Sequence, residues 1–125
     1  MNLLEQGSTW LDAQRLKMSR TVTYKRASSQ VQMPAVIGKT IFRIDTGLGL
    51  TERFEARDYI VLARDLVLSG QSVEPAAGDC IVESDGVKTY RYEVLGPGGE
   101  PCWRYSDPFR RCLRIHTKLI AVEGA

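Results

Sequence analysis

The side chains that could take part in catalysis are few in this 125-residue sequence. His116 is the only histidine, and Arg114 and Lys118 flank it on the same face of an expected strand. Two neighbouring cations disfavour the charged imidazolium, which does not suit a general acid. No serine stands in the strand-to-helix turn of a nucleophile elbow. Three carboxylates occur singly at expected turns or strand breaks, where Asp ordinarily binds backbone amides: Asp58, Asp65 and Asp79.

The cysteines also predict no reactive centre. The sequence holds an odd number of them and no CxxC pair: Cys80, Cys102 and Cys112. A zinc site built on Cys112 and His116 would still need further ligands in a chain with one histidine. We therefore expect the thiols to be small buried hydrophobes, and we expect no enzymatic activity, metal site or cofactor.

Aromatic and basic residues interleave near the end of the chain. The set consists of Trp103, Arg104, Tyr105, Phe109, Arg110, Arg111, Arg114 and Lys118. Aromatic rings mixed with arginine can stack on single-stranded bases and contact phosphate. Protein interfaces are enriched in the same residue types. The aromatic residues can equally anchor a long loop on the body of the protein, and the sequence leaves these three interpretations open. We take the set as candidate interface residues.

A second candidate lies in residues 39–53, the most loop-like stretch of the middle of the chain. Glycines bracket Leu48 and precede Leu50, so this segment is expected to be flexible. An exposed apolar pair on such a loop is typical of a surface that contacts a partner. The alternative is that both leucines tuck under the end of the fold. The pattern is not a dinucleotide fingerprint, because the third glycine and the strand-turn-helix frame are missing.

The elements that position these residues follow from the hydrophobic periodicity. Residues 1–18 have apolar side chains at helical spacing and predict an N-terminal α-helix. The period then changes to two over residues 19–122, with turn signals at the spacing of a barrel or sandwich. The sequence predicts a mainly β protein: a small antiparallel β-barrel of about six or seven strands, with long loops at 39–53 and 96–109. We expect residues 1–125 to form one domain.

Individual strands carry more specific expectations. Val22 and Tyr24 should face inward, and so should one face of the strand after the Asp85-Gly86 turn. An alternating apolar set is interrupted by Asp58: Phe54, Ala56, Ile60 and Leu62. In the last strand three residues should face the core, namely Leu113, Ile115 and Leu119. Three others should face solvent, namely Arg114, His116 and Lys118.

Charge and composition exclude several classes of protein. The net charge of +2 is too small to indicate a nucleic-acid-binding protein by itself. Basic residues gather at 15–26 and 104–118, and acidic residues are commoner at 45–58 and 74–93. Separated charge can pair copies head to tail, although scattered solvated charge is the plain alternative. No apolar run is long enough to span a bilayer, and the N-terminus does not resemble a signal peptide. We expect synthesis in the cytoplasm.

Several segments together resemble one family. They are the Gly78-Asp79 and Asp85-Gly86 turns with Tyr92-Glu93-Val94, the stretches MNLLEQGSTWLDAQR and RDYIVLARDLVL, and GGEPCWRYSDPFRRCLRIHTK. This combination resembles the small neck proteins of tailed bacteriophages and prophages, the head-closure or stopper proteins that join capsid and tail. The resemblance covers most of the chain and rests on structural turns and the aromatic-basic loop.

The resemblance implies a β-barrel subunit of a homo-oligomeric ring in the virion neck. Its partners would be copies of itself, the portal adaptor above, a tail-completion or tail-tube protein below and, non-specifically, packaged DNA. A loop of each subunit would project into the channel; the candidates are Arg43, Leu48, Leu50 and Arg53, with the 96–109 loop as competitor. Alternatives are a tail-completion subunit or a small nucleic-acid-binding β-barrel.

Overall fold

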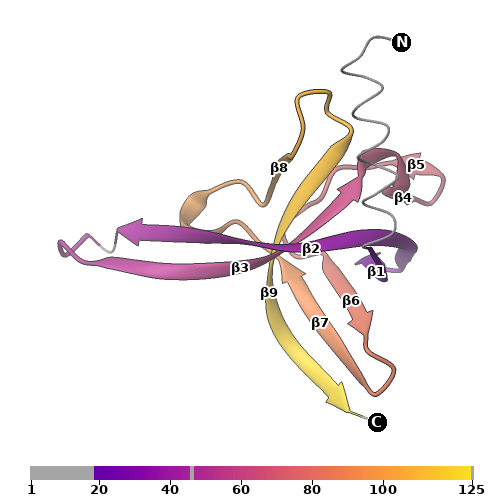
Figure 1. Ribbon diagram of the computed structural model, residues 1–125, viewed down its shortest axis with the longest axis horizontal. Coiled ribbons are helices and arrows are strands. Elements are labelled where there is room, and N and C mark those ends of the chain that lie inside the picture. Colours follow the sequence, from indigo (N-terminus) through magenta and orange to yellow (C-terminus); the bar gives the residue numbers. More distant parts are fainter. Residues whose placement is uncertain (1–18, 46, 125) are drawn as a thin grey trace.

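The computed structural model describes residues 19–45 and 47–124. Strands make up most of this part, and two short 3-10 helices accompany them (Figure 1). The elements are β1 (Arg20–Arg26), β2 (Ser29–Asp45), β3 (Thr51–Leu62), η1 (Ala63–Asp65), β4 (Val67–Leu68), β5 (Gln71–Ser72), β6 (Cys80–Ser84), β7 (Lys88–Val94), η2 (Pro97–Gly99), β8 (Trp103–Tyr105) and β9 (Cys112–Gly124). The expected helix over residues 1–18 lies outside the described residues.

Seven of the described strands form one antiparallel sheet in the order β3-β2-β1-β6-β7-β9-β8, and β4 and β5 form a small separate pair. A further pairing joins β3 to β9, from Arg57↔Thr117 to Leu62↔Cys112. Each of β3, β2, β1, β6, β7 and β9 therefore pairs with at least two neighbours. The prediction of a mainly β, antiparallel protein is confirmed. Among the described residues no helix has the length and apolar character needed to cross a bilayer.

The hydrophobic core collects one face of most strands. Val22 and Tyr24 of β1 are buried as expected, as are Tyr92 and Val94 of β7. The remaining core residues come mainly from the other long strands: Met33, Ala35, Tyr59, Val61, Leu66, Leu68, Ile81, Leu113 and Ile115. Each large apolar side chain buried in this way contributes about 1.5–3 kcal/mol relative to an exposed one.

Strand β3 differs from its expected pattern because it is covered on both faces. Tyr59 and Val61 enter the main core, whereas the expected apolar set lies on the opposite face. On that second face Ala56, Asp58 and Leu62 are buried too. The prediction that Asp58 marks a strand break is wrong, because β3 continues through it and pairs it with Gly38 and His116.

Strand β9 also departs from simple alternation. Leu113 and Ile115 are buried as predicted, but Leu119 is 43% exposed, because β9 has left β3 and the core at that point. His116 was expected in solvent and is only 3% exposed, because its ring pairs with the buried Asp58 carboxylate and packs edge-on against Phe42. Lys118 is exposed as predicted.

Both expected long loops contain regular structure. Most of residues 39–53 extends β2 and β3, which pair continuously from Val36↔Ile60 to Asp45↔Thr51. Only a short turn connects them, where Asp45 Oδ1 accepts a hydrogen bond of 2.9 Å from Gly47 N and Gly47 has φ +82°. Glycine is the residue that adopts this backbone without strain. The 96–109 segment holds η2 and the edge strand β8.

Candidate functional site

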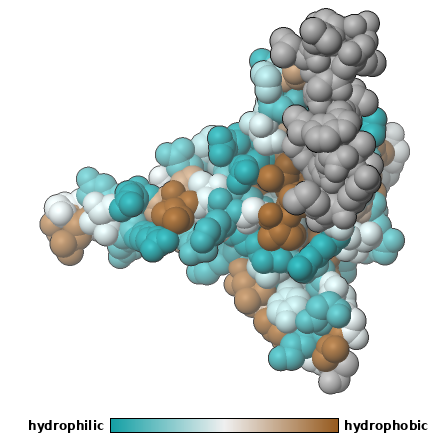
Figure 2. All heavy atoms as spheres, in the orientation of Figure 1, coloured by the Kyte–Doolittle hydropathy of each residue, from teal (hydrophilic) through white to brown (hydrophobic). Residues whose placement is uncertain are grey.

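The most prominent surface feature is a two-stranded arm, residues 39–56, formed by the far halves of β2 and β3. Pairing of β2 with β1 ends at Ala35, and pairing of β3 with β9 begins at Arg57, so the arm extends beyond the rest of the sheet (Figure 1). At its end Leu48 is 83% exposed and Leu50 is 65% exposed. Figure 2 shows apolar atoms at this end. Of the two interpretations left open by the sequence, exposure of the leucines is the one the structure shows.

The arm has one open face and one supported face. Arg43 and Arg53 are exposed on the open face and lie directly opposite each other in the register. Like charges in that position repel, so a pair of this kind costs stability unless an anion neutralises it. On the other face Ile44 rests against η2, where a Cβ on Gly98 would come within 3.0 Å of it. The support keeps the open face and its two cations turned toward solvent.

A buried polar network holds the root of the arm. The Asp58 carboxylate accepts hydrogen bonds from Arg114 Nη1 at 2.7 Å and from the Thr40 hydroxyl, and it pairs with His116 Nδ1 at 2.8 Å. Burial by itself raises the pKa of Asp58, but the hydrogen bonds from His116, Thr40 and Arg114 outweigh it and hold that pKa below its ordinary value. Phe42 meets the His116 ring edge-on at 5.0 Å between centroids. The network connects β2, β3 and β9.

A second buried carboxylate, Glu83, joins β6 to β1 and β3. It accepts hydrogen bonds of 2.6 Å from Tyr59 Oη and Arg57 Nη2, and Arg20 Nη1 lies 3.1 Å from its other oxygen. Burial raises the pKa of Glu83, whereas these hydrogen bonds lower it and prevail. The Arg57 guanidinium also lies 5.0 Å from the centre of the Tyr92 ring. This cluster stabilises the fold and leaves no free acid or base.

A third carboxylate, Asp79, fixes the turn before β6. It accepts hydrogen bonds from the Tyr24 hydroxyl, from Arg26 Nη2 at 2.9 Å and from Ala76 N at 3.1 Å. Burial and the Asp79 hydrogen bond raise the pKa of Tyr24 well above its ordinary value. The prediction that Asp79 binds a backbone amide is confirmed, and the two side-chain partners are additional. Within the described residues no group of three or more His, Cys, Asp or Glu side chains can hold a metal ion.

The structure divides the aromatic-basic set instead of bringing it together. Trp103 packs against the core and meets Tyr105 edge-on at 5.0 Å, as a loop anchor would. Arg114 is engaged with Asp58. The remaining members lie on or near the surface: Arg104, Tyr105, Phe109, Arg110 and Arg111 around the β8–β9 turn, and Lys118 farther along β9.

Sequence reasoning did not find the basic cluster at this turn. Arg64 of η1 joins Arg110 and Arg111 around a cavity of about 230 Å³. The hydrogen bond of 2.8 Å from Ala63 N to Arg111 O brings the two segments together. The two hydrogen-bonded residues are 48 positions apart in sequence, and the pairing of β3 with β9 makes them neighbours. Three arginines at one cavity form a surface suited to an acidic partner.

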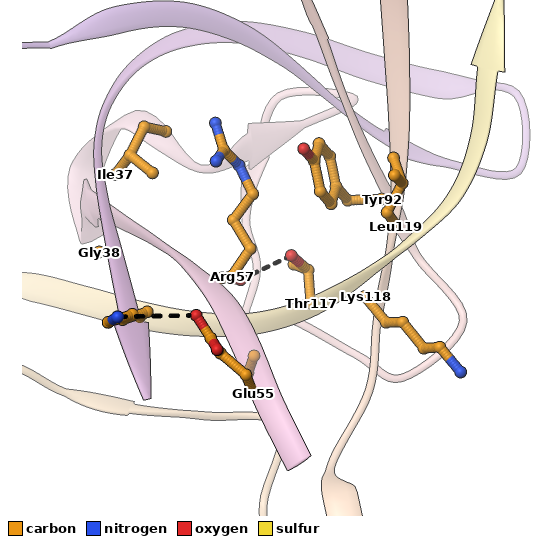
Figure 3. Close-up of a pocket in the computed structure, with 10 residues that line it drawn as sticks. Ile37, Gly38, Glu55, Arg57, Tyr92, Thr117, Lys118 and Leu119 are labelled. Atoms are coloured by element: carbon orange, nitrogen blue, oxygen red, sulfur yellow. Dashed lines mark hydrogen bonds and ion pairs between the residues drawn. The ribbon is translucent and has the colours of Figure 1, made fainter. Parts of the chain in front are cut away.

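Sequence reasoning also missed a notch where β3 and β9 separate. It has a volume of about 690 Å³, and Figure 3 shows the residues around it. Its lining is Ile37, Gly38, Lys39, Glu55, Ala56, Arg57, Tyr92, Thr117, Lys118 and Leu119. The arm forms one wall of the notch, and the part of β9 beyond Thr117 forms the other. No local sequence signal marks such a feature, because it depends on where two distant strands stop pairing.

Comparison with known proteins decides the family. The family model for phage head-tail joining proteins matches residues 1–124. The chain belongs to the phage head-tail joining protein family. No curated protein and no solved structure matches it in the corresponding searches.

Membership in this family indicates the part of the virion to which the protein belongs. A phage head-tail joining protein is a structural protein of the virion neck, and it contacts components of the head and of the tail. The resemblance noted in the sequence is thereby confirmed as that of a head-tail joining protein. The arm, the basic cluster and the notch are surface features of this head-tail joining protein.

Proposed function

We propose that the chain is a head-closure subunit. In this proposal it assembles with copies of itself into a ring that closes the DNA exit of the capsid and accepts the tail. Its body is a small β-barrel formed by β3, β2, β1, β6, β7 and β9, and the pairing of β3 with β9 supports this closure. The role is structural and includes no catalytic step. The proposed location is the neck of the virion, after synthesis in the host cytoplasm.

The arm is the observation that carries the proposal. A ring that closes a channel needs an element that reaches away from each subunit, and the arm extends beyond the strands that hold the core (Figure 1). Its open face presents Arg43 and Arg53. These cations would contact the phosphates of packaged DNA without sequence preference and in a salt-dependent manner. We assign this face to the channel.

The other surfaces fit neighbours above and below the ring. The basic cluster of Arg64, Arg110 and Arg111 suits an acidic surface of the portal adaptor or of the tail-completion or tail-tube protein. Tyr105 and Phe109 lie beside it and are exposed. Aromatic residues next to arginine are typical of the residues that dominate binding energy at protein interfaces.

Deletion of the gene from its phage or prophage tests the proposal. Electron microscopy should show full-sized capsids and complete tails that are not joined, with DNA lost from the capsids. Complementation with the intact gene should restore joined virions. Normal joined virions in the deletion would contradict the proposal. Capsids that keep their DNA but lack tails would contradict closure and favour a tail-completion role.

A further inference from the structure

In the notch, the facing edges of β3 and β9 are not paired with any described strand. The two strands pair as far as Arg57↔Thr117, and beyond that point β3 continues with β2 while β9 continues with β7. His116 O accepts a hydrogen bond from Leu95 N on the β7 side. Because backbone groups alternate in direction along a strand, those of Leu119 point to the opposite side, into the notch. Among the described residues no strand pairs with β9 there.

The lining of the notch combines apolar side chains with cations. Ile37 and Tyr92 lie around its interior, and Leu119 lies on the β9 side (Figure 3). Three lining residues are basic and one is acidic: Lys39, Arg57 and Lys118 against Glu55. Glu83 lies behind this lining and forms an ion pair with Arg57 that neutralises its charge. One lysine therefore remains on each wall, and Lys39 has only a weak, exposed ion pair of 3.7 Å with Glu55.

The end of the arm has the complementary properties. Leu48 and Leu50 are its exposed apolar residues. Asp45 and Glu52 flank them, and by the alternation of the two strands these carboxylates lie on opposite faces of the hairpin. The arm end is thus an apolar projection with the Glu52 carboxylate on its supported face, whereas on the open face Asp45 lies beside Arg43 and Arg53. The notch is an apolar recess with one lysine on each wall.

From this match we infer that the arm end of one subunit docks in the notch of a second copy of the chain. Leu48 and Leu50 enter the apolar interior, and Glu52 approaches Lys118. Two different surfaces meet, so the contact is heterologous, and it generates a ring when the rotation between subunits closes. The inference rests on the proposed ring and deepens it by naming the subunit contact. It assigns Leu48 and Leu50 to a neighbouring subunit rather than to the channel.

Reciprocal charge reversal of the purified chain tests this contact. Self-association is measured by sedimentation over a range of concentrations at low salt. Glu52→Lys and Lys118→Glu should each weaken association about five-fold or more, because each places like charges together. The double variant should return to within about three-fold of the original chain, since the pair is restored with exchanged signs. Glu74→Lys, an exposed reversal outside the notch, serves as the control and should change little. If neither single reversal weakens self-association, the inference is overturned.

Cross-linking locates the contact and separates it from the proposed function. Copies carrying Leu48→Cys are mixed with copies carrying Leu119→Cys, in solution and by co-expression during phage assembly. A short bismaleimide should then link position 48 of one copy to position 119 of another, as read by mass spectrometry of the linked peptides. Links only between two positions 48 would overturn the docking, as would their complete absence from virions that contain the chain. Virions that lack the chain contradict the proposed function instead, and the solution cross-link then decides the inference.

Discussion

Asp58 and His116 lie opposite each other on β3 and β9 and form a pair at 2.8 Å, both almost completely buried. The pair sits where the arm leaves the sheet, and Thr40 on β2 contacts the same carboxylate. One acidic side chain therefore links the three strands that meet at the root of the arm. The first prediction follows from the residues that contact Asp58.

Asp58→Ala should destabilise the fold strongly. Removal of the carboxylate leaves the partly buried Arg114 without its anion and the buried His116 without its hydrogen-bond partner, and breaking a buried pair in this way costs about 3 kcal/mol or more. Urea unfolding followed by fluorescence measures the loss. The control is Glu55→Gln on the same strand, whose ion pair with Lys39 is exposed and contributes less than about 1 kcal/mol. Equal effects of the two changes would contradict the importance of the network.

Stability should fall in acid because two buried carboxylates have lowered pKa values. The folded-state pKa values of Asp58 and Glu83 lie below their ordinary values. In the unfolded chain such groups bind protons near pH 4. Their contribution is therefore complete above that pH and is lost as the pH falls toward the lower folded-state values. Urea midpoints at a series of pH values should show this decline. Asp58→Asn should make the decline shallower, and an unchanged slope would exclude Asp58 as a source.

Tyr59→Phe should cost about 1–3 kcal/mol, because the buried Glu83 loses a hydrogen-bond donor. Tyr90→Phe is the matched control: the same change removes a hydrogen bond of 3.2 Å between exposed groups and should cost much less than Tyr59→Phe. Burial and the nearby Glu83 raise the pKa of Tyr59, so its contribution is complete below pH 10 and declines above it. Unfolding midpoints at neutral and alkaline pH check both statements.

Replacement of Arg43 and Arg53 by alanine should separate folding from function. Removal of two like charges that face each other should leave stability unchanged or raise it by a few tenths to about 1 kcal/mol. Under the proposed channel role, particles carrying the double variant should lose packaged DNA, most clearly at raised salt. DNA retention is measured by nuclease sensitivity of purified particles. Lys88→Ala with Arg91→Ala removes two exposed cations of β7 and should have no such effect. Retention unaffected by the arm variant would argue against DNA contact there.

The alternation of apolar and polar residues predicts burial correctly in the strands that have one face against the core. Val22, Tyr24, Tyr92 and Val94 follow the two-residue period and are buried as expected. The same reasoning was wrong for Asp58 and His116, because it treats a charged or ionisable residue as a mark of solvent. These two residues satisfy each other, and that is visible only when the register of β3 and β9 is known.

The candidate sites also divide into features that a short segment of sequence predicts and features that depend on contacts between distant segments. The exposure of Leu48 and Leu50 agreed with one sequence interpretation, because adjacent glycines and apolar residues form a local signal. The arm differs from the predicted loop because Ile41 on the open face and Thr40 on the supported face interrupt the alternation of β2. The notch and the cluster around Arg64 each combine segments that are distant in sequence. Pattern alone carries no information about such juxtapositions.

The uninterrupted course of β2 has a mechanical consequence. Its 17 residues run from the pairing with β1 in the core to the turn of the arm, so one backbone belongs to both. A force applied along the arm is transmitted directly to the β1–β2 ladder and, through β3, to the β3–β9 ladder, and loads their hydrogen bonds in shear. Bonds loaded in shear resist together, whereas bonds peeled from one end yield one at a time. Tension along the arm would therefore be borne by the core of the subunit before the hairpin itself could open.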